Sequence, residues 1–377
     1  MKKIKVLFTI PNFDTAGSGK ALLNIAKGLD QEVFEAHIMC LHNRGAFFKV
    51  VEESGLKIHV YKYVSNARPV LRMFKECWRV SRKFKEIAPD VIHSYHYSAD
   101  YTEAIAARMA GVPWVFTKKN MNWGGKSKNA WKLRSFLARK IAVQNTDMKR
   151  DFYNGSKKAV LIPRGVDVAY FRPSMSMNDF DFNSGFSESQ RFLICVANFV
   201  PVKGIEILIQ AFNKVAVKYK NWGLLLVGDN NNPYGDELNL LIQELKLSDR
   251  VTFTGKQLDV RPYLQRAEIF LLPTKNEGRR EGSPVALLEA MANGKVVMGS
   301  DIPGIRDQLA KFPDFLFEAS DVDGLSKKLD FYMDQSNEAL KKLGHSFYEH
   351  VNLEYPIEKE IEKHETLYKD VTGRKRR

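Results

Sequence analysis

Two glutamates in the second half of the chain have a type and spacing suited to holding a phosphorylated sugar. Glu281 comes just before a predicted helix, and Glu289 lies within it, in the segment EGSPVALLEAMANG. Backbone N–H groups at Gly282, Ser283 and Val285 would point out of the helix start, where phosphate is attracted. Carboxylates accept hydrogen bonds from the vicinal hydroxyls of a ribose or hexose. The alternative is that Glu281 only favours the helix N-terminus and Glu289 is solvated.

The boundaries of this helix are also marked in the sequence. Ser283 suits the N-cap position and Pro284 the first helical position, and Gly294 is expected to end the helix. Helical spacing then places its apolar positions on one face. These positions are Val285, Leu288 and Met291.

Lys203 supplies a cation of the kind that a phosphate requires. It lies in VANFVPVKGIEILIQAF, on a turn after an apolar strand and before an amphipathic helix. A lone Lys-Gly pair on such a turn is ordinarily a surface feature. The later glutamate helix makes a phosphate contact the stronger interpretation.

Alternating apolar runs and helical patterns place these residues in a layered fold. Strand-like runs such as KIKVLFTI and PDVIHSY alternate with helical segments through the first half, and RFLICVANF restarts the alternation. This pattern predicts an α/β fold with two doubly wound, Rossmann-like halves of parallel strands. We predict domains over residues 1–170 and 191–345, with a polar linker over 171–190. A helix over 346–377 would pack back toward the first domain and end in a basic tail.

Ligands of open α/β sheets bind beyond the carboxyl ends of the strands, so both halves are expected to face a common cleft. One helix of the first half, over residues 70–87, is expected to gather its apolar side chains on one face. These are Leu71, Phe74, Cys77, Trp78 and Phe84.

The segment AGSGK (residues 16–20) contains Gly-Ser-Gly-Lys, which is similar to part of an ATP-binding phosphate loop. That motif requires glycine at residue 14 and a hydroxyl at residue 21, where the chain has Asp14 and Ala21. The dinucleotide fingerprint fails as well, because its third glycine would fall at Leu22. A glycine turn between the first strand and the first helix is the remaining prediction.

Two histidines of the first half are candidates for a site. His93 and His96 lie three residues apart at the end of PDVIHSYH, so on a strand they would point to opposite faces. His96 is the better candidate because it is nearer the carboxyl end of the strand. A packed or surface histidine is the alternative for each.

The segments VANFVPVKG, LLLVGD, DRVTFTG, IFLLPT, EGSPVALLEAMANG and DIPGIRD resemble the donor domain of retaining GT-B glycosyltransferases of the family-four, glycogen-synthase-like group. The resemblance implies that Glu281 binds the donor sugar, Glu289 the donor ribose, and Lys203 the diphosphate. It also implies a nucleotide-sugar co-substrate linked to UDP or GDP, no metal and no other cofactor. Retention would follow a front-face mechanism in which the leaving phosphate helps to deprotonate the acceptor.

The same resemblance extends to other positions. The glycine loop would approach the donor phosphate, which adds Gly17, Ser18 and Gly19 to the donor-binding residues. On the acceptor side, Asn120 falls where many relatives have a histidine. The family ordinarily has an arginine shortly before the lysine, whereas this chain has Asn198 and Val200, so Asn198 would line the donor site without that cation.

Arg279 or Arg280 is a candidate to replace the missing arginine. If neither does so, the alternative is a catalytically weak or inactive nucleotide-sugar-binding partner. A nucleoside triphosphatase or a nicotinamide enzyme built on the glycine loop is a third hypothesis. With turnover retained, the resemblance implies a glycosyltransferase acting on a glycan or lipid-linked acceptor in polysaccharide or lipopolysaccharide biosynthesis.

The chain of 377 residues carries a net charge of +14, which indicates an anionic partner. Residues 117–150 hold ten Lys/Arg and one acidic residue, and WKLRSFLARKIA interleaves cations with apolar side chains. This segment is either an interfacial helix on anionic lipid or an ordinary helix with a solvated basic face. No nucleic-acid motif accompanies the charge. Three widely spaced cysteines and short apolar runs predict a cytoplasmic protein with buried thiols, with peripheral attachment to the inner face of the membrane left open.

Overall fold

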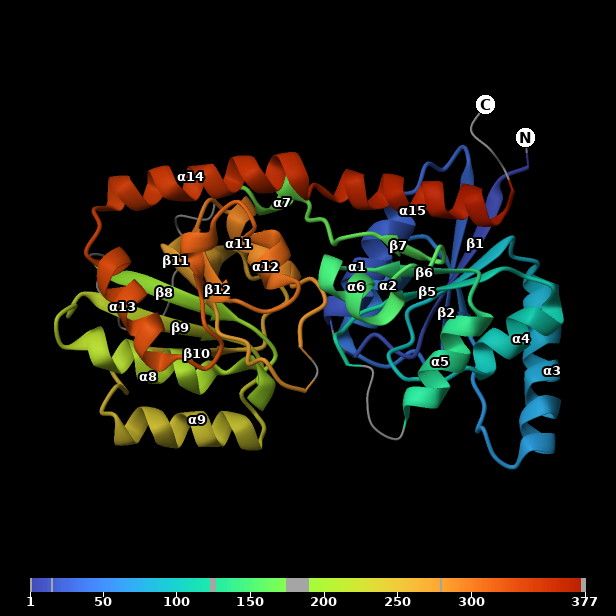
Figure 1. Cartoon of the computed structure of the whole chain (residues 1–377), viewed down its shortest axis with the longest axis horizontal. Helices are drawn as coiled ribbons and strands as arrows, with labels where there is room; N and C mark the ends of the chain where they lie inside the picture. The colour runs from blue at the N-terminus through green and yellow to red at the C-terminus, as the bar shows by residue number, and fades with distance from the viewer. Residues whose placement is uncertain (1, 15, 123–126, 174–189, 279, 374–377) are drawn as a thin grey trace. The chain divides into compact units, whose positions relative to one another are not determined.

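The structure, a computed structural model, describes residues 2–14, 16–122, 127–173, 190–278 and 280–373. The chain divides into two compact units (Figure 1). Unit 1 comprises residues 1–163 and 358–377, and unit 2 comprises residues 164–357. The domain limits expected at residues 170, 190 and 345 stay predictions, and most of the expected linker, residues 174–189, lies outside the described residues.

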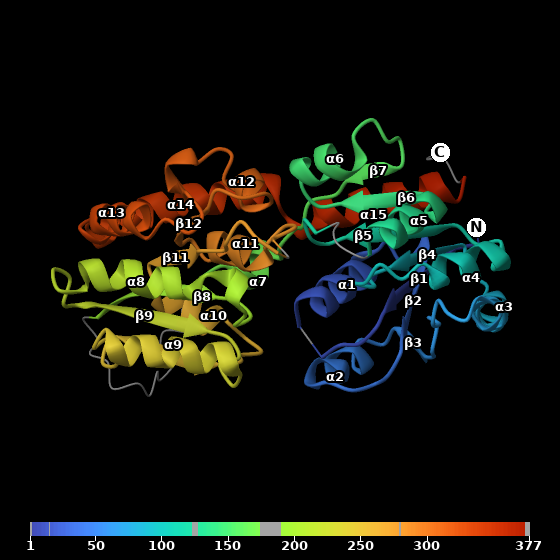
Figure 2. The same cartoon turned by 60° about the horizontal axis from the view of Figure 1, so that its bottom comes forward.

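Unit 1 is built on a seven-stranded parallel sheet with the order β3-β2-β1-β4-β5-β6-β7. The order reverses between β1 and β4, which is the arrangement of a doubly wound sheet. The strands are β1 (Ile4–Ile10), β2 (Phe34–Cys40), β3 (Lys57–Val60), β4 (Val91–Ser94), β5 (Trp114–Lys118), β6 (Lys140–Val143) and β7 (Ala159–Leu161). Most of their side chains are buried, because helices cover both faces of the sheet (Figure 2).

The helices of unit 1 form two layers, and each layer has its own apolar cluster against the sheet. One layer contains α1 (Ala16–Gly28), α2 (Ala46–Glu52) and α15 (Ile357–Val371). The other contains α3 (Val70–Ile87), α4 (Thr102–Ala110), α5 (Lys128–Leu137) and α6 (Thr146–Tyr153). The cysteines of the chain, Cys40, Cys77 and Cys195, are all free and buried, as predicted.

The glycine turn predicted near residue 17 is helix instead. Helix α1 begins at Ala16, so Gly17, Ser18 and Gly19 lie in its first turn. A Cβ at Gly19 would lie 2.7 Å from the Phe13 ring, whereas one at Gly17 would meet no atom within 4 Å. The glycine at residue 19 therefore allows the helix to pack closely on Phe13.

The apolar face predicted for the helix over residues 70–87 is also wrong in part. Cys77 and Phe84 are buried, but Leu71, Phe74 and Trp78 are exposed to solvent. A different stripe, which follows the same helical period, faces the core. It consists of Met73, Cys77, Val80, Ser81, Phe84 and Ile87.

Unit 2 holds a six-stranded parallel sheet with the order β10-β9-β8-β11-β12-β13, in which the order reverses between β8 and β11. Its strands are β8 (Arg191–Val196), β9 (Trp222–Val227), β10 (Val251–Gly255), β11 (Ile269–Leu272), β12 (Val296–Ser300) and β13 (Leu316–Phe317). Its helices are α7 (Val168–Phe171), α8 (Ile205–Ala216), α9 (Pro233–Glu244), α10 (Arg261–Arg266), α11 (Val285–Ala292), α12 (Ile305–Gln308), α13 (Val322–Met333) and α14 (Asn337–Glu354).

The start of α11 differs from the prediction. The helix begins at Val285, and Pro284 rather than Ser283 takes the N-cap position, without a side-chain cap. The Ser283 hydroxyl instead accepts a hydrogen bond from Gln308 Nε2 at 3.0 Å. Gly294 follows the helix with a left-handed φ of 68°, as expected of a residue that ends it.

Candidate functional site

In unit 2, Lys203 lies on a tight turn at the carboxyl end of β8. Residues 201–203 form one 3₁₀ turn, and Gly204 follows with a left-handed φ of 63°. A Cβ at Gly204 would lie 2.3 Å from the carbonyl oxygen of Pro273, just after β11. Glycine is therefore required here by both the conformation and the space, and it holds the lysine turn against the end of β11.

The structure brings Lys203 and Glu281 together. The Lys203 amine forms an ion pair with the Glu281 carboxylate, and the two side chains are 19% and 15% exposed. A backbone hydrogen bond of 2.8 Å from Lys275 N to Val202 O ties the loop that carries Glu281 to the lysine turn. Two of the predicted site residues therefore form one charged, half-buried pair.

The segment from Gly282 to Glu289 is held by the loop that follows β12. Gly304 has φ 86°, and a Cβ there would lie 2.5 Å from the carbonyl oxygen of Gly282. Gln308 holds the Ser283 hydroxyl from the same side. Val285 is the first residue of α11, and Glu289, 8% exposed, lies within that helix.

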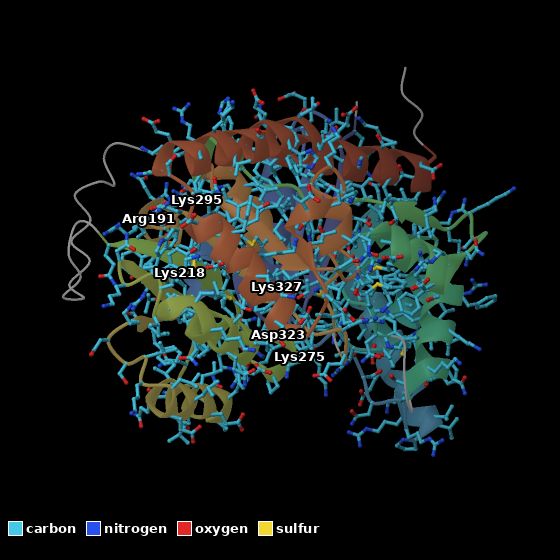
Figure 3. All side chains as sticks on the ribbon, turned by 60° about the vertical axis from the view of Figure 1, so that its left-hand side comes forward. Arg191, Lys218, Lys275, Lys295, Asp323 and Lys327 are labelled. Atoms are coloured by element: carbon cyan, nitrogen blue, oxygen red, sulfur yellow. The ribbon has the colours of Figure 1, made fainter. Side chains whose placement is uncertain are left out.

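The cation that the family has before Lys203 is missing from this chain, and the described residues include a further candidate to replace it. Asn198 is exposed, Arg280 donates to Asn276 at 2.6 Å, and Arg279 lies outside the described residues. Lys275, which we did not predict and which Figure 3 labels, packs against Gly204 of the lysine turn. Its amine lies 2.5 Å from a Glu206 carboxylate oxygen. The sequence signal that could have identified Lys275 is its position in the PTKNEG loop, shortly before Glu281.

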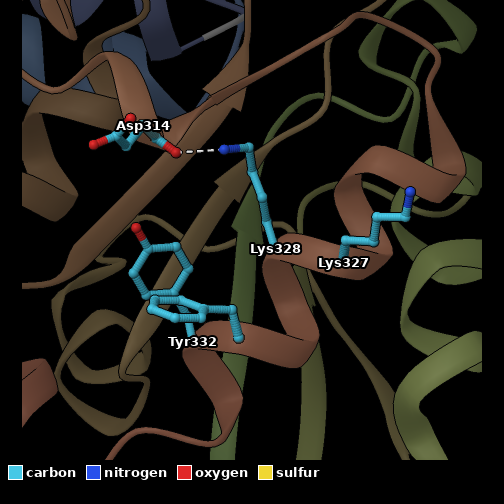
Figure 4. Close-up of a pocket in the computed structure, with 5 residues that line it drawn as sticks. Asp314, Lys327, Lys328 and Tyr332 are labelled. Carbon is cyan, nitrogen blue, oxygen red and sulfur yellow. Dashed lines mark hydrogen bonds between the residues drawn. The ribbon is translucent and has the colours of Figure 1, made fainter.

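Two surface hollows of unit 2 differ in their relation to these residues. One, of about 620 Å³, is lined by Asn276, in the loop that carries Glu281, and by Asp301 after β12. The other, of about 350 Å³, lies beside α13 and contains none of the predicted site residues (Figure 4). Its lining residues are Asp314, Lys327, Lys328, Phe331 and Tyr332.

In unit 1, hydrogen bonds tie together the loops at the carboxyl ends of β1, β4 and β5. Tyr97 Oη donates to Asn12 Oδ1 at 3.0 Å, and the Lys119 amine donates to the carbonyl oxygen of Tyr95. His96 belongs to the β4 loop and Asn120 to the β5 loop. The predicted acceptor residues therefore lie on neighbouring loops at the same edge of the sheet.

His93 and His96 have different surroundings. Strand β4 ends at Ser94, so His96 lies beyond it and the expectation of opposite strand faces does not apply. His93 is fully buried, and its ring nitrogens lie 2.7 Å from Tyr368 Oη and 2.9 Å from Thr117 Oγ1, so it is a packed histidine. His96 is half-buried on its loop. Burial, with Arg134 and Lys119 nearby, lowers the pKa of His96 to about 3, so its imidazole is neutral near pH 7.

Arg134 supports the His96 loop, which the sequence did not indicate. Its guanidinium is fully buried and donates to the carbonyl oxygens of Ser98 and Asp100, at 3.0 and 2.7 Å. It also lies 4.7 Å from the Phe116 ring centre. Trp131 is buried as well. Helix α5 ends at Leu137 and β6 begins at Lys140, so a single helix over residues 131–142, whether interfacial or ordinary, is wrong in its extent.

Two further properties concern metals and membranes. Among the described residues, no group of three or more His, Cys, Asp or Glu side chains could hold a metal ion. Within those same ranges, no helix has both the length and the apolar composition that crossing a bilayer demands.

The two sheets define the class of protein. Two Rossmann-like units, with a lysine turn and a glutamate helix at the carboxyl ends of the second sheet, form the GT-B architecture. The family described as "Glycosyl transferases group 1" matches residues 176–349, and "Glycosyltransferase Family 4" matches residues 15–170. The chain belongs to the group 1 glycosyltransferases.

Individual proteins are similar to parts or all of the chain. N-acetyl-alpha-D-glucosaminyl L-malate synthase of Bacillus anthracis is 31% identical over 54% of this chain and 51% of its own length, so the chain spans about half of that relative. The UDP-Gal:alpha-D-GlcNAc-diphosphoundecaprenol alpha-1,3-galactosyltransferase of Escherichia coli is 24% identical over 80% of each chain. The Anabaena protein HepE, solved with UDP and glucose, has a TM-score of 0.83 at 19% identity, covering 97% of this chain and 99% of its own.

Proposed function

We propose that the chain transfers a sugar from a UDP- or GDP-linked donor to a glycan or lipid-linked acceptor, with retention at the anomeric carbon and without a metal ion. The observation that carries this proposal is the Lys203–Glu281 pair at the carboxyl ends of the second sheet. The Escherichia coli relative, named for UDP-Gal and a diphosphoundecaprenol acceptor, supports the donor and acceptor classes. The pathway proposed is cell-surface polysaccharide or lipopolysaccharide synthesis at the cytoplasmic face of the membrane.

In this proposal the donor binds to unit 2. The diphosphate competes with Glu281 for the Lys203 amine, and the released carboxylate accepts hydrogen bonds from the donor sugar. Glu289 holds the ribose hydroxyls, and the backbone of Asn198, Gly282, Ser283 and Val285 completes the site. Gly17, Ser18 and Gly19, in the first turn of α1, stay proposed phosphate-contacting residues of unit 1. Lys275 supplies the second cation, because it packs against the lysine turn.

The acceptor is proposed to bind the unit 1 loops that carry His96 and Asn120. A neutral imidazole and an amide orient a hydroxyl group, and the leaving phosphate takes its proton. No protein residue is then needed as a general base. Charge on the departing diphosphate is stabilised by lysine amines and backbone N–H groups, which is how the reaction proceeds without a metal.

The test is a titration calorimetry series with UDP, GDP and ATP, followed by a donor-hydrolysis screen of nucleotide sugars with and without EDTA. We expect UDP or GDP to bind, and slow donor hydrolysis to persist in EDTA and to release the retained anomer first, as read by NMR. Binding without turnover of any donor would favour the inactive partner. ATP binding that neither UDP nor GDP displaces would defeat the proposal.

A further inference from the structure

Helix α3 presents a solvent-facing surface that the core does not use. Leu71, Phe74 and Trp78 are 86%, 46% and 55% exposed. They are spaced by three and four residues, so they form one stripe along the helix. The residues of α3 that pack into unit 1 form a different stripe of the helix. Figures 1 and 2 show α3 at the edge of unit 1, beside α4.

A row of cations runs beside this apolar stripe. Its exposed members are Arg72, Lys75, Arg79 and Arg82, one or more on each turn of the helix. The Arg82 guanidinium lies 5.2 Å from the centre of the Trp78 ring. The acidic residues of α3 are Glu76, which lies 3.2 Å from Arg72, and Glu86, which lies 2.6 Å from Lys83. The exposed face is therefore half apolar and half cationic.

We propose that this face of α3 lies on the surface of an anionic lipid bilayer. Large apolar side chains, tryptophan among them, enter the boundary between headgroups and acyl chains. Long basic side chains beside them reach the headgroup phosphates while their stems stay among apolar groups. Both halves of the α3 face are used in this arrangement, whereas a purely acidic partner would leave the Leu71, Phe74 and Trp78 stripe in water.

The other basic segment of unit 1 is less suited to this contact. In α5, Trp131 and Arg134 are buried, which leaves Leu133 and Phe136 as its exposed large apolar side chains. The Lys158 amine lies 5.5 Å from the Phe136 ring centre. The structure thus assigns the main lipid contact to α3 rather than to residues 117–150, and α5 supplies a matched control.

The experiment is vesicle flotation of the full chain without donor or acceptor, so its outcome does not depend on the proposed transferase activity. Vesicles contain phosphatidylcholine alone or with about 30% phosphatidylglycerol. We expect binding to the anionic vesicles that falls with salt, and at least about tenfold weaker partitioning for L71S/F74S/W78S and for K75Q/R79Q/R82Q. Circular dichroism should be unchanged, because all six residues are exposed.

The control L133S/F136S should partition within about twofold of the wild type. Two results would overturn the proposal. The first is a wild-type chain that does not float with anionic vesicles. The second is an apolar α3 variant that binds as the wild type does, including the case in which L133S/F136S alone loses binding.

Discussion

The amine of Lys203 contacts the carboxylate of Glu281, 78 residues further along the chain. Local structure does not bring the two residues together. The contact depends on the turn after β8 and the loop after β11, which meet because β8 and β11 are neighbours at the point where the strand order reverses. Ligand sites of doubly wound sheets form at this point.

Removal of either partner should impair turnover. We expect K203A and E281A each to lower kcat/KM for the donor more than tenfold, since a charge-assisted contact contributes about 1.5–3 kcal/mol. Steady-state kinetics with the donor found in the hydrolysis screen measures this. The matched control is K214A, which removes an exposed ion pair with Asp323 in the same unit and should keep wild-type rates. Figure 3 labels Asp323. Wild-type rates in both site variants would reject the assignment.

Lys275 should behave as a second cation of the donor site. We expect K275M to weaken UDP or GDP binding several-fold, because one charged contact with the diphosphate is removed. Calorimetry should show a smaller loss for the matching nucleoside, uridine or guanosine, which has no phosphate. Equal losses for nucleotide and nucleoside would instead indicate that the loop has moved.

The turn that carries Lys203 should tolerate no side chain at residue 204. G204A places a Cβ in a left-handed conformation and 2.3 Å from a carbonyl oxygen. The control G255A meets no atom within 4 Å, although Gly255 also has a left-handed φ of 71°. Thermal denaturation should show about 1 kcal/mol of destabilisation for G255A and clearly more for G204A. Similar melting temperatures in the two variants would contradict this account of the turn.

His96 should make stability depend on pH in a defined direction. Its pKa is lowered from 6.5 to about 3 by burial, with Arg134 and Lys119 adding to the effect. Between these values the unfolded chain binds more protons than the folded one, so stability falls as the pH falls below 6.5. Urea denaturation at about pH 7 and about pH 5 should therefore show a larger loss for the wild type than for H96Q. An NMR titration of the His96 imidazole with a midpoint near 6.5 would show that its pKa is not lowered and would refute this explanation.

The hydrogen bond between His93 and Tyr368 should stabilise unit 1. Y368F removes the hydroxyl that contacts a buried ring nitrogen at 2.7 Å, and we expect a loss of about 1–3 kcal/mol in the free energy of unfolding. The control Y97F removes a more exposed hydroxyl and should cost less than about 0.5 kcal/mol. Urea denaturation measures the free energy of unfolding of both variants. A Y368F chain as stable as Y97F would show that the His93–Tyr368 hydrogen bond makes no net contribution to stability.

The layered α/β fold was predictable because buried parallel strands are apolar throughout and alternate with helical patterns. The buried face of α3 was predicted only in part. The expected and observed stripes share Cys77 and Phe84, and only the packed structure shows that Met73 and Ile87 are inside. Periodicity measures spacing along one helix, whereas burial depends on what the helix packs against.

The candidate site, like the fold, was predictable from the sequence only in part. Lys203 and Glu281 were found from residue type, spacing and resemblance, and the structure adds their contact. The partners of Ser283 and Arg134 could not be found in this way. Gln308 is 25 residues from Ser283, and the carbonyl groups that hold Arg134 belong to a loop more than 30 residues earlier. Hydrogen bonds of that range follow from the topology.

The last helix has a consequence for how the chain is made. Leu367, Tyr368 and Val371 of α15 belong to the core of unit 1, where the Tyr368 ring lies 6.1 Å from those of Phe8 and Phe34. A ribosome delivers these residues only after all of unit 2 has been translated. Unit 1 therefore completes its core only after unit 2 has been translated. Residues 1–163 keep part of their apolar sheet uncovered during the translation of nearly two hundred further residues.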